Sequence, residues 1–68
     1  MIKKYYYINK KNIYFLRFLL EAYDGIANFE TIDANKGLIL LYIARGALDE
    51  FDMLINELKK DIAVYELL

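Results

Sequence analysis

Four carboxylates in the first half of the chain are the side chains whose types could support chemistry. They are Glu21, Asp24, Glu30 and Asp33. Paired carboxylates can act as general acid and general base. Asp24, however, is followed by Gly25, which is typical of a helix end, and Asp33 opens a polar turn. We therefore expect none of the four carboxylates to be catalytic.

The loop at residues 33–37 has two features that can be compared with ion sites. Asp33 and Asn35 resemble a fragment of a calcium loop, but no Glu follows at the closing position. Lys36 and Gly37 lack the glycine-rich lead-in of a phosphate-binding loop. The sequence instead predicts a hairpin turn in which Asn35 and Gly37 are able to hold positive φ.

The residue inventory excludes most other chemistry. The 68 residues include no His, Cys, Ser, Gln, Trp or Pro, and Thr31 is the only threonine. A nucleophile–base pair cannot be assembled from what remains, and zinc or iron–sulfur sites need Cys or His. We expect no enzyme activity, no catalytic residue, no cofactor and no metal.

Length and composition predict one domain covering residues 1–68. Hydrophobic residues make up 59% of the chain, which argues against disorder and exceeds what so small a body can bury. The longest apolar run, residues 38–44, is far shorter than the roughly 20 residues that cross a bilayer. Polar residues 9–12 and Arg17 interrupt any export signal. We expect a cytoplasmic protein with no membrane partner.

The charges are unevenly distributed, although the net charge is only −1. All five charged residues before Glu21 are positive, whereas four basic residues oppose ten acidic ones from Glu21 onward, a balance of −6. A basic end and an acidic end could steer assembly, or they could be two solvated surfaces.

The elements that must position these residues follow from apolar spacing and chain breakers. We expect strands at residues 3–8, 26–33 and 38–44, helices at residues 11–23 and 47–61, and a tail at residues 62–68 that forms a short fourth strand or extends the helix. Asn9 or Asn12 is expected to cap the first helix. Lysines 59 and 60 are expected in the last turn of the second helix.

Each predicted helix has an apolar face. In the first helix this face contains residues 13, 16, 19, 20 and 23, widened by Phe15, Phe18 and Ala22. In the second helix it contains residues 48, 51, 54, 55, 58 and 62. The order βαββα, with a closing β, predicts an α+β ferredoxin-like fold with an antiparallel sheet and two helices on one face.

The other face of that sheet is the predicted interaction surface. Pleating places five large side chains there: Tyr5, Tyr7, Leu38, Leu40 and Tyr42. Burying them is worth at most about 7–15 kcal/mol, and association costs about 4–15 kcal/mol. We expect a homodimer or a protein partner on this face, with Asn28 and Glu30 near its rim.

Aromatic residues on two central strands also invite comparison with RNA-recognition domains, in which such rings stack on unpaired bases. The glycine-and-aromatic signature of that family is missing from residues 38–44. Residues 15–32, which read FLRFLLEAYDGIANFETI, resemble ACT-type regulatory domains. That resemblance implies a dimer with an amino-acid ligand, although residues 9–12 lack the acidic residue and glycine of that family.

A closer resemblance, covering residues 5–60, is to a family of short bacterial proteins known only as a domain of unknown function. The matching residues are Tyr5, Tyr6, Tyr7, Ile8, Ile13, Leu16, Phe18, Leu20, Glu21, Tyr23, Asp24, Gly25, Thr31, Ile32, Asp33 and Gly37. This resemblance implies a bacterial source and a ferredoxin-like body, and it implies no activity.

Three functions remain open. The first is a self-associating interaction module, the second is an ACT-like metabolite-binding domain with a polar pocket at a dimer interface near Asn12 and Gly25, and the third is a nucleic-acid binder. The sequence identifies no specific ligand.

Overall fold

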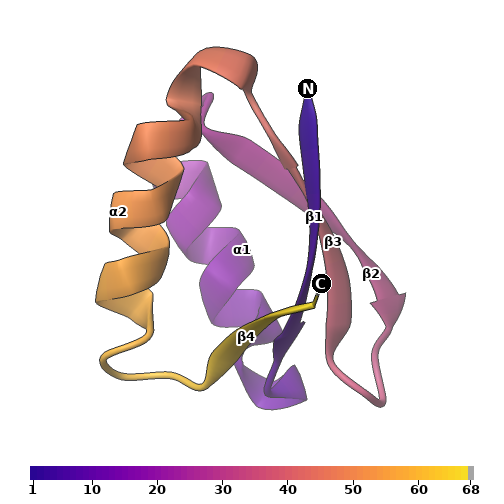
Figure 1. Cartoon of the computed structure of the whole chain (residues 1–68). Coiled ribbons are helices and arrows are strands. Elements are labelled where there is room, and N and C mark those ends of the chain that lie inside the picture. The colour runs from indigo at the N-terminus through magenta and orange to yellow at the C-terminus, as the bar shows by residue number, and fades with distance from the viewer. Residues whose placement is uncertain (68) are drawn as a thin grey trace.

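The structure is a computed structural model that describes residues 1–67 as four strands and two helices (Figure 1). The elements are β1 (Ile2–Ile8), α1 (Ile13–Ala22), β2 (Ala27–Asp33), β3 (Leu38–Ile43), α2 (Leu48–Leu58) and β4 (Val64–Leu67). Single 3-10 turns, Lys10–Asn12 and Arg45–Ala47, lead into the two helices. The tail predicted at 62–68 thus contains a fourth strand, and its last residue, Leu68, lies outside the described residues.

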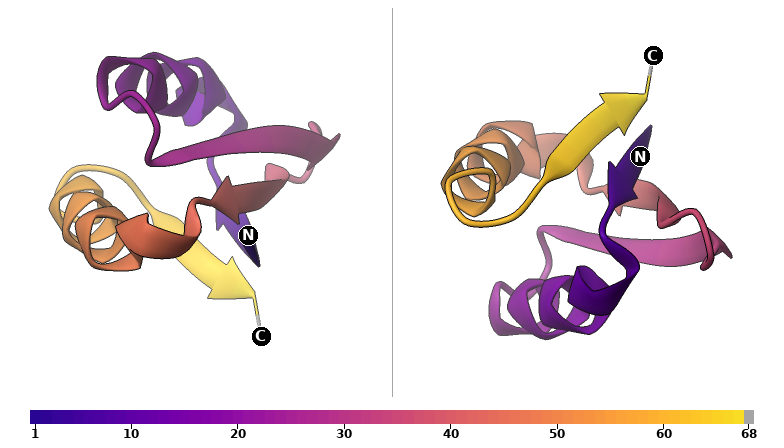
Figure 2. Two further views of the ribbon diagram at one scale, coloured as in Figure 1. Left: turned by 90° about the horizontal axis from the view of Figure 1, so that it is seen from above. Right: turned by 90° about the horizontal axis from the view of Figure 1, so that it is seen from below.

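The four strands form one sheet in the order β2-β3-β1-β4, and every neighbouring pair is antiparallel. Both helices lie on the same side of this sheet, as the two views in Figure 2 show. The predicted ferredoxin-like fold is confirmed. The two central strands are β1 and β3, so the edges of the sheet are β2 and β4.

The core lies between the sheet and the helices. The sheet contributes Tyr6, Ile8, Phe29, Ile39, Leu41, Ile43 and Val64, and the helices contribute Leu16, Leu20, Phe51, Leu54, Ile55 and Leu58. The predicted stripe on α2 is confirmed. The prediction that Phe15, Phe18 and Ala22 widen the buried face of α1 is wrong, because all three are exposed and Phe18 is 71% accessible. Only Leu16 and Leu20 of α1 are buried, so the row of side chains that α1 packs against the sheet is narrow.

The helix ends differ slightly from prediction. The Asn9 carboxamide accepts a hydrogen bond from the Lys11 backbone N–H at 3.2 Å, so Asn9 caps the 3-10 turn that leads into α1, whereas the Asn12 side chain makes no capping hydrogen bond. Lys59 and Lys60 follow α2 rather than ending it, because the helix stops at Leu58. Gly25 has a φ of +84° and turns the chain after α1, as predicted.

The β2–β3 hairpin is set by Asp33 and Gly37. One Asp33 carboxylate oxygen accepts the backbone N–H groups of Asn35 and Lys36 at 3.1 and 3.2 Å. Of the two residues expected to be able to hold positive φ, Gly37 does so, with a φ of +72°, and Asn35 does not. Because Asp33 already accepts two backbone N–H groups of the turn, one residue with left-handed backbone geometry is enough to close it.

The core contains one phenol, that of Tyr6, whose ring packs edge-on against Phe51 with centroids 6.1 Å apart. Burial, together with the nearby carboxylates of Glu66 and Asp52, raises the pKa of Tyr6 to about 12. Burial disfavours the phenolate because a charged oxygen loses its hydration there.

This shift predicts a loss of stability in alkali. An unfolded tyrosine ionises near pH 10, so between pH 10 and 12 the unfolded chain releases a proton that the folded chain retains. The stabilisation is complete below pH 10 and is lost as pH rises to about 12. We expect a loss of roughly 2 kcal/mol from Tyr6.

Denaturant unfolding at pH 9 and pH 12 measures this loss, and Tyr6→Phe is the matched variant. The variant should lose less stability over the same interval than the unmodified protein. An identical loss in both proteins would contradict the assignment.

Candidate functional site

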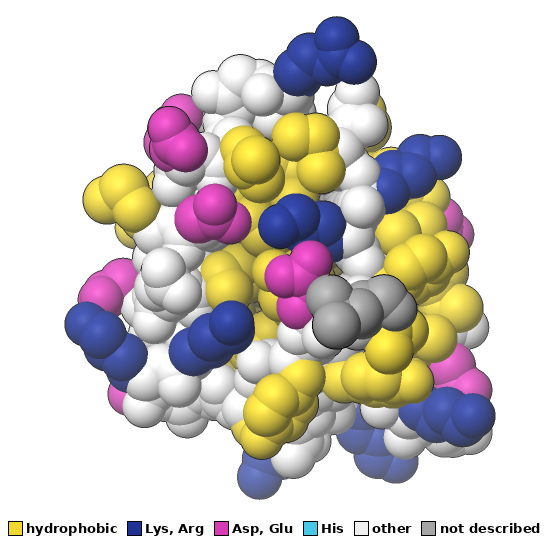
Figure 3. Space-filling model, in the orientation of Figure 1, with side chains coloured by type: hydrophobic (Ala, Val, Ile, Leu, Met, Phe, Trp, Pro, Cys, Tyr) yellow, Lys and Arg dark blue, Asp and Glu magenta, His cyan; other side chains and the backbone are white. Residues whose placement is uncertain are grey.

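The five residues predicted on the open sheet face are brought together there. In the register of the sheet, Tyr5 lies opposite Leu40 and Tyr7 lies opposite Leu38 on the neighbouring strand. Tyr42 follows on the same face of β3. The apolar side chains on the sheet side of the molecule are visible along the right of Figure 3. We call this surface the open face.

Leu40 differs from the other four predicted residues because it is already buried in the single chain. Only 7% of its surface is accessible, although it is not part of the cluster between sheet and helices. Its register partners are Tyr5 on β1 and Glu30 on β2, whose side chains flank it. The prediction that Leu40 is an exposed residue is therefore wrong, and it serves as the floor of the open face.

Two residues on the open face were missed by sequence reasoning. β4 pairs with β1 so that Tyr65 lies opposite Tyr7 and Leu67 lies opposite Tyr5. Both are well exposed, Tyr65 at 66%. The alternation in the tail carried the signal, since Val64 is buried and the next residue must point the other way. With these two residues the apolar surface spans three adjacent strands.

The rim of the open face is polar. The Tyr42 hydroxyl donates a hydrogen bond to the Glu30 carboxylate, and the Lys3 ammonium lies 5.8 Å from the centroid of the Tyr42 ring. The hydrogen bond to Glu30 raises the pKa of Tyr42, because it stabilises the neutral phenol, and partial burial adds to the rise. Tyr42 is therefore held in place by two side chains of opposite charge, and Glu30 lies on the rim as predicted.

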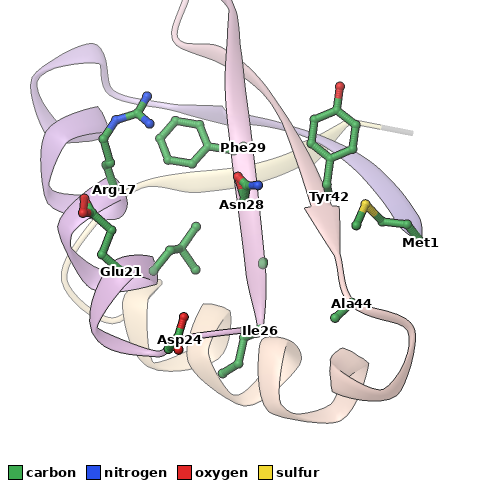
Figure 4. Close-up of a pocket in the computed structure, with 12 residues that line it drawn as sticks. Met1, Arg17, Glu21, Asp24, Ile26, Asn28, Phe29, Tyr42 and Ala44 are labelled. Atoms are coloured by element: carbon green, nitrogen blue, oxygen red, sulfur yellow. The ribbon is translucent and has the colours of Figure 1, made fainter.

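A cavity of about 520 Å³ opens at the β2 edge of the sheet, beside α1 (Figure 4). The Arg17 guanidinium lies 4.6 Å from the centroid of the Phe29 ring, and Figure 4 shows it pointing toward that ring. Glu21 and Asp24 line the same cavity. Its walls thus offer charges of both signs around an aromatic ring.

The structure divides the four candidate carboxylates among three places. Glu21 and Asp24 line the β2-edge cavity, whereas Glu30 binds Tyr42 and Asp33 closes the hairpin. Within residues 1–67, no group of three or more Asp and Glu side chains is arranged to hold a metal ion. Neither helix in this part of the chain combines the length and the apolar character that crossing a bilayer requires.

Asn12 and Gly25 do not share a pocket. Gly25 lines the β2-edge cavity, and Asn12 lines a separate groove between the two helices. The predicted pocket near both residues belongs to a dimer interface, so it stays a prediction.

The fold and the open face define a small α+β domain of ferredoxin-like architecture whose sheet is covered by helices on one side only. The chain belongs to the family described as "Domain of unknown function (DUF4911)", whose model matches residues 6–62. The predicted resemblance to such a family is confirmed. The match covers β1 from Tyr6 through α2, and β4 lies beyond it. No curated protein and no solved structure matches the chain.

Proposed function

We propose that this chain is a non-catalytic interaction module that pairs with a second copy of itself through the open face. The observation that carries the proposal is the continuous apolar surface on three adjacent strands, formed by Tyr5, Tyr7, Leu38, Tyr42, Tyr65 and Leu67 over the floor residue Leu40. Contiguous solvent-facing apolar surfaces mark interaction sites in soluble proteins.

The area that a dimer interface needs is a modest fraction of the accessible surface of this protein. A standard interface buries about 800 Å² on each partner, or about one sixth of the 4728 Å² of accessible surface. One face of a four-stranded sheet can supply that much. Because Leu40 is already buried, the gain comes from the surrounding rings and from Leu67.

The charges at the rim suit a two-fold dimer. Such a dimer apposes the same patch on both copies. Lys3 and Glu30 lie on either side of Tyr42, so a two-fold axis near this ring can set Lys3 of one copy against Glu30 of the other. Pairs of this kind fix the register of an interface more than its affinity.

The open face supports the two alternatives less well. Glu30, which lies on the rim of the open face and is bound to Tyr42, repels a phosphodiester backbone, and this weakens the case for nucleic acid. A metabolite with a carboxylate would need the Arg17 guanidinium, which is already stacked on Phe29. The β2-edge cavity, where such a metabolite would bind, does not include the exposed surface that Tyr65 and Leu67 add.

Sedimentation velocity tests the dimer. We expect the unmodified protein to be a dimer at micromolar concentrations. Tyr65→Asp should weaken association at least tenfold, because a carboxylate would be buried without a partner at an apolar interface. Tyr65 is mostly exposed in the single chain, so the fold should tolerate the change.

The matched control is Tyr14→Asp. Tyr14 is 82% exposed and lies in the first turn of α1, on the helix side of the molecule. This variant should leave the dimer unchanged. A monomeric unmodified protein at high micromolar concentration, or equal effects of the two substitutions, would refute the proposed function.

A further inference from the structure

A second apolar surface lies on the opposite side of the molecule, in a groove between α1 and α2. These helices lie side by side over the sheet (Figure 2). The groove has a volume of about 660 Å³, within the range of functional binding sites. Phe15, Leu19 and Tyr23 line it from the α1 side, at four-residue intervals, and Met53 and Leu54 line it from α2.

The fold itself does not require this lining to be so apolar. Phe15 and Tyr23 are about half exposed, and Met53 is 70% exposed. A helix face turned toward water normally carries polar residues. Methionine is also the side chain that adapts most readily to different partners. The groove therefore has the composition of a docking surface rather than of a solvated one.

The charges around the groove identify the kind of partner. Glu50, Glu57 and Asp61 line it, and no Lys or Arg among the described residues does. One ammonium already sits on this rim, since Lys60 lies 2.6 Å from the Glu57 carboxylate. Both members of that pair are exposed, so a partner's cation can replace Lys60 at little cost.

We propose that this groove binds a basic amphipathic helix of a partner protein. Apolar side chains of such a helix would lie on Phe15 and Met53, and its lysines or arginines would reach the acidic rim. Grooves between helices recognise peptides in this way, through anchors at three- and four-residue spacing. The acidic rim repels anionic lipids and fatty-acid carboxylates. This site is independent of the open face, so a dimer would carry two such grooves.

The test uses two synthetic peptides with the same leucine face in helical spacing, one with lysines and one with glutamates at all other positions. Fluorescence anisotropy of the labelled peptides against the full chain measures binding. We expect the lysine peptide to bind and the glutamate peptide not to. Phe15→Ala should weaken the lysine peptide about tenfold.

Glu50→Lys and Asp49→Lys form a matched pair for the charge argument. Both residues are exposed and lie in the first turn of α2, but only Glu50 lines the groove. Glu50→Lys should weaken binding about fivefold, and Asp49→Lys should change it less than about twofold.

The proposal would be overturned if the lysine peptide failed to bind, if the two peptides bound equally, if the two substitutions had equal effects, or if anionic vesicles bound and competed with the lysine peptide. Loss of the protein's own dimer in Phe15→Ala would show instead that a second copy occupies the groove, and it would also overturn the proposal.

Discussion

Replacing Gly37 with alanine should destabilise the protein by about 3 kcal/mol or more. A φ of +72° costs a residue with a side chain about 1–2 kcal/mol. A Cβ at this position would also lie 1.9 Å from the Ile8 carbonyl oxygen. That backbone cannot move freely, because the Ile8 N–H donates to the Gly37 carbonyl at 2.9 Å. A chain of this length has a total stability of only roughly 3–10 kcal/mol.

Substitutions at the two other glycines separate the cost of positive φ from the cost of the close contact with Ile8. Gly25 has a φ of +84° but nothing within 4 Å of its Cβ position, so Gly25→Ala should cost about 1 kcal/mol. Gly46 has neither restriction, and Gly46→Ala should be neutral or slightly stabilising. Thermal unfolding followed by circular dichroism should rank the three variants in this order. Equal melting temperatures for the Gly37 and Gly25 variants would show that the close contact with Ile8 relaxes without cost.

The element order could be predicted because each element carries a local signal. Residues 38–44 are apolar on both faces, which indicates a central strand. The stripe on α2 repeats at helical spacing, and Gly25 and Gly37 mark the points where the chain turns. These signals depend on residues that are close in the sequence, so they can be read without knowledge of the tertiary contacts.

The predictions made from the sequence are wrong where tertiary contacts decide whether a side chain is buried. Phe15 and Phe18 have the same polarity as core residues, and only the width of the contact between α1 and the sheet leaves them outside. Leu40 is covered by its neighbours on adjacent strands, a property of the assembled sheet. The groove between α1 and α2 is formed by both helices together, so it could not be predicted from the sequence of either helix alone.

The open face could be predicted in part, for a related reason. The alternation of β1 places Tyr5 and Tyr7 on one side whatever their partners are. Tyr65 and Leu67 join them only because β4 pairs with β1 in one particular register. Register is a long-range property, so the extent of the surface could not be read from the chain even though its centre could.

The excess of apolar residues noted in the sequence is thus divided between two opposite surfaces. One is the open face of the sheet, and the other is the groove beside Phe15 and Met53. The core between them is thin, and it depends on a few large side chains. Among these, Phe51 makes the central contact.

Replacing Phe51 with alanine should therefore cost about 3–5 kcal/mol, enough to unfold much of the population. Phe51 has no accessible surface, and its ring packs edge-on against Tyr6. The substitution loses the transfer free energy of the ring, leaves a cavity, and removes an aromatic pair worth about 0.5–1.5 kcal/mol. Guanidinium unfolding monitored by circular dichroism measures the change.

Phe18→Ala is the control, because it makes the same chemical change at a site that is 71% exposed on α1. It should alter stability by less than about 0.5 kcal/mol. Phe51→Leu should fall between the two variants, since leucine refills most of the volume but cannot replace the edge-on contact with Tyr6. Equal losses at positions 51 and 18 would mean that the sheet and α2 are held together mainly by something other than this contact. Pairing with a second copy through the open face would then be the remaining source of stability, so folding and dimerisation would be coupled.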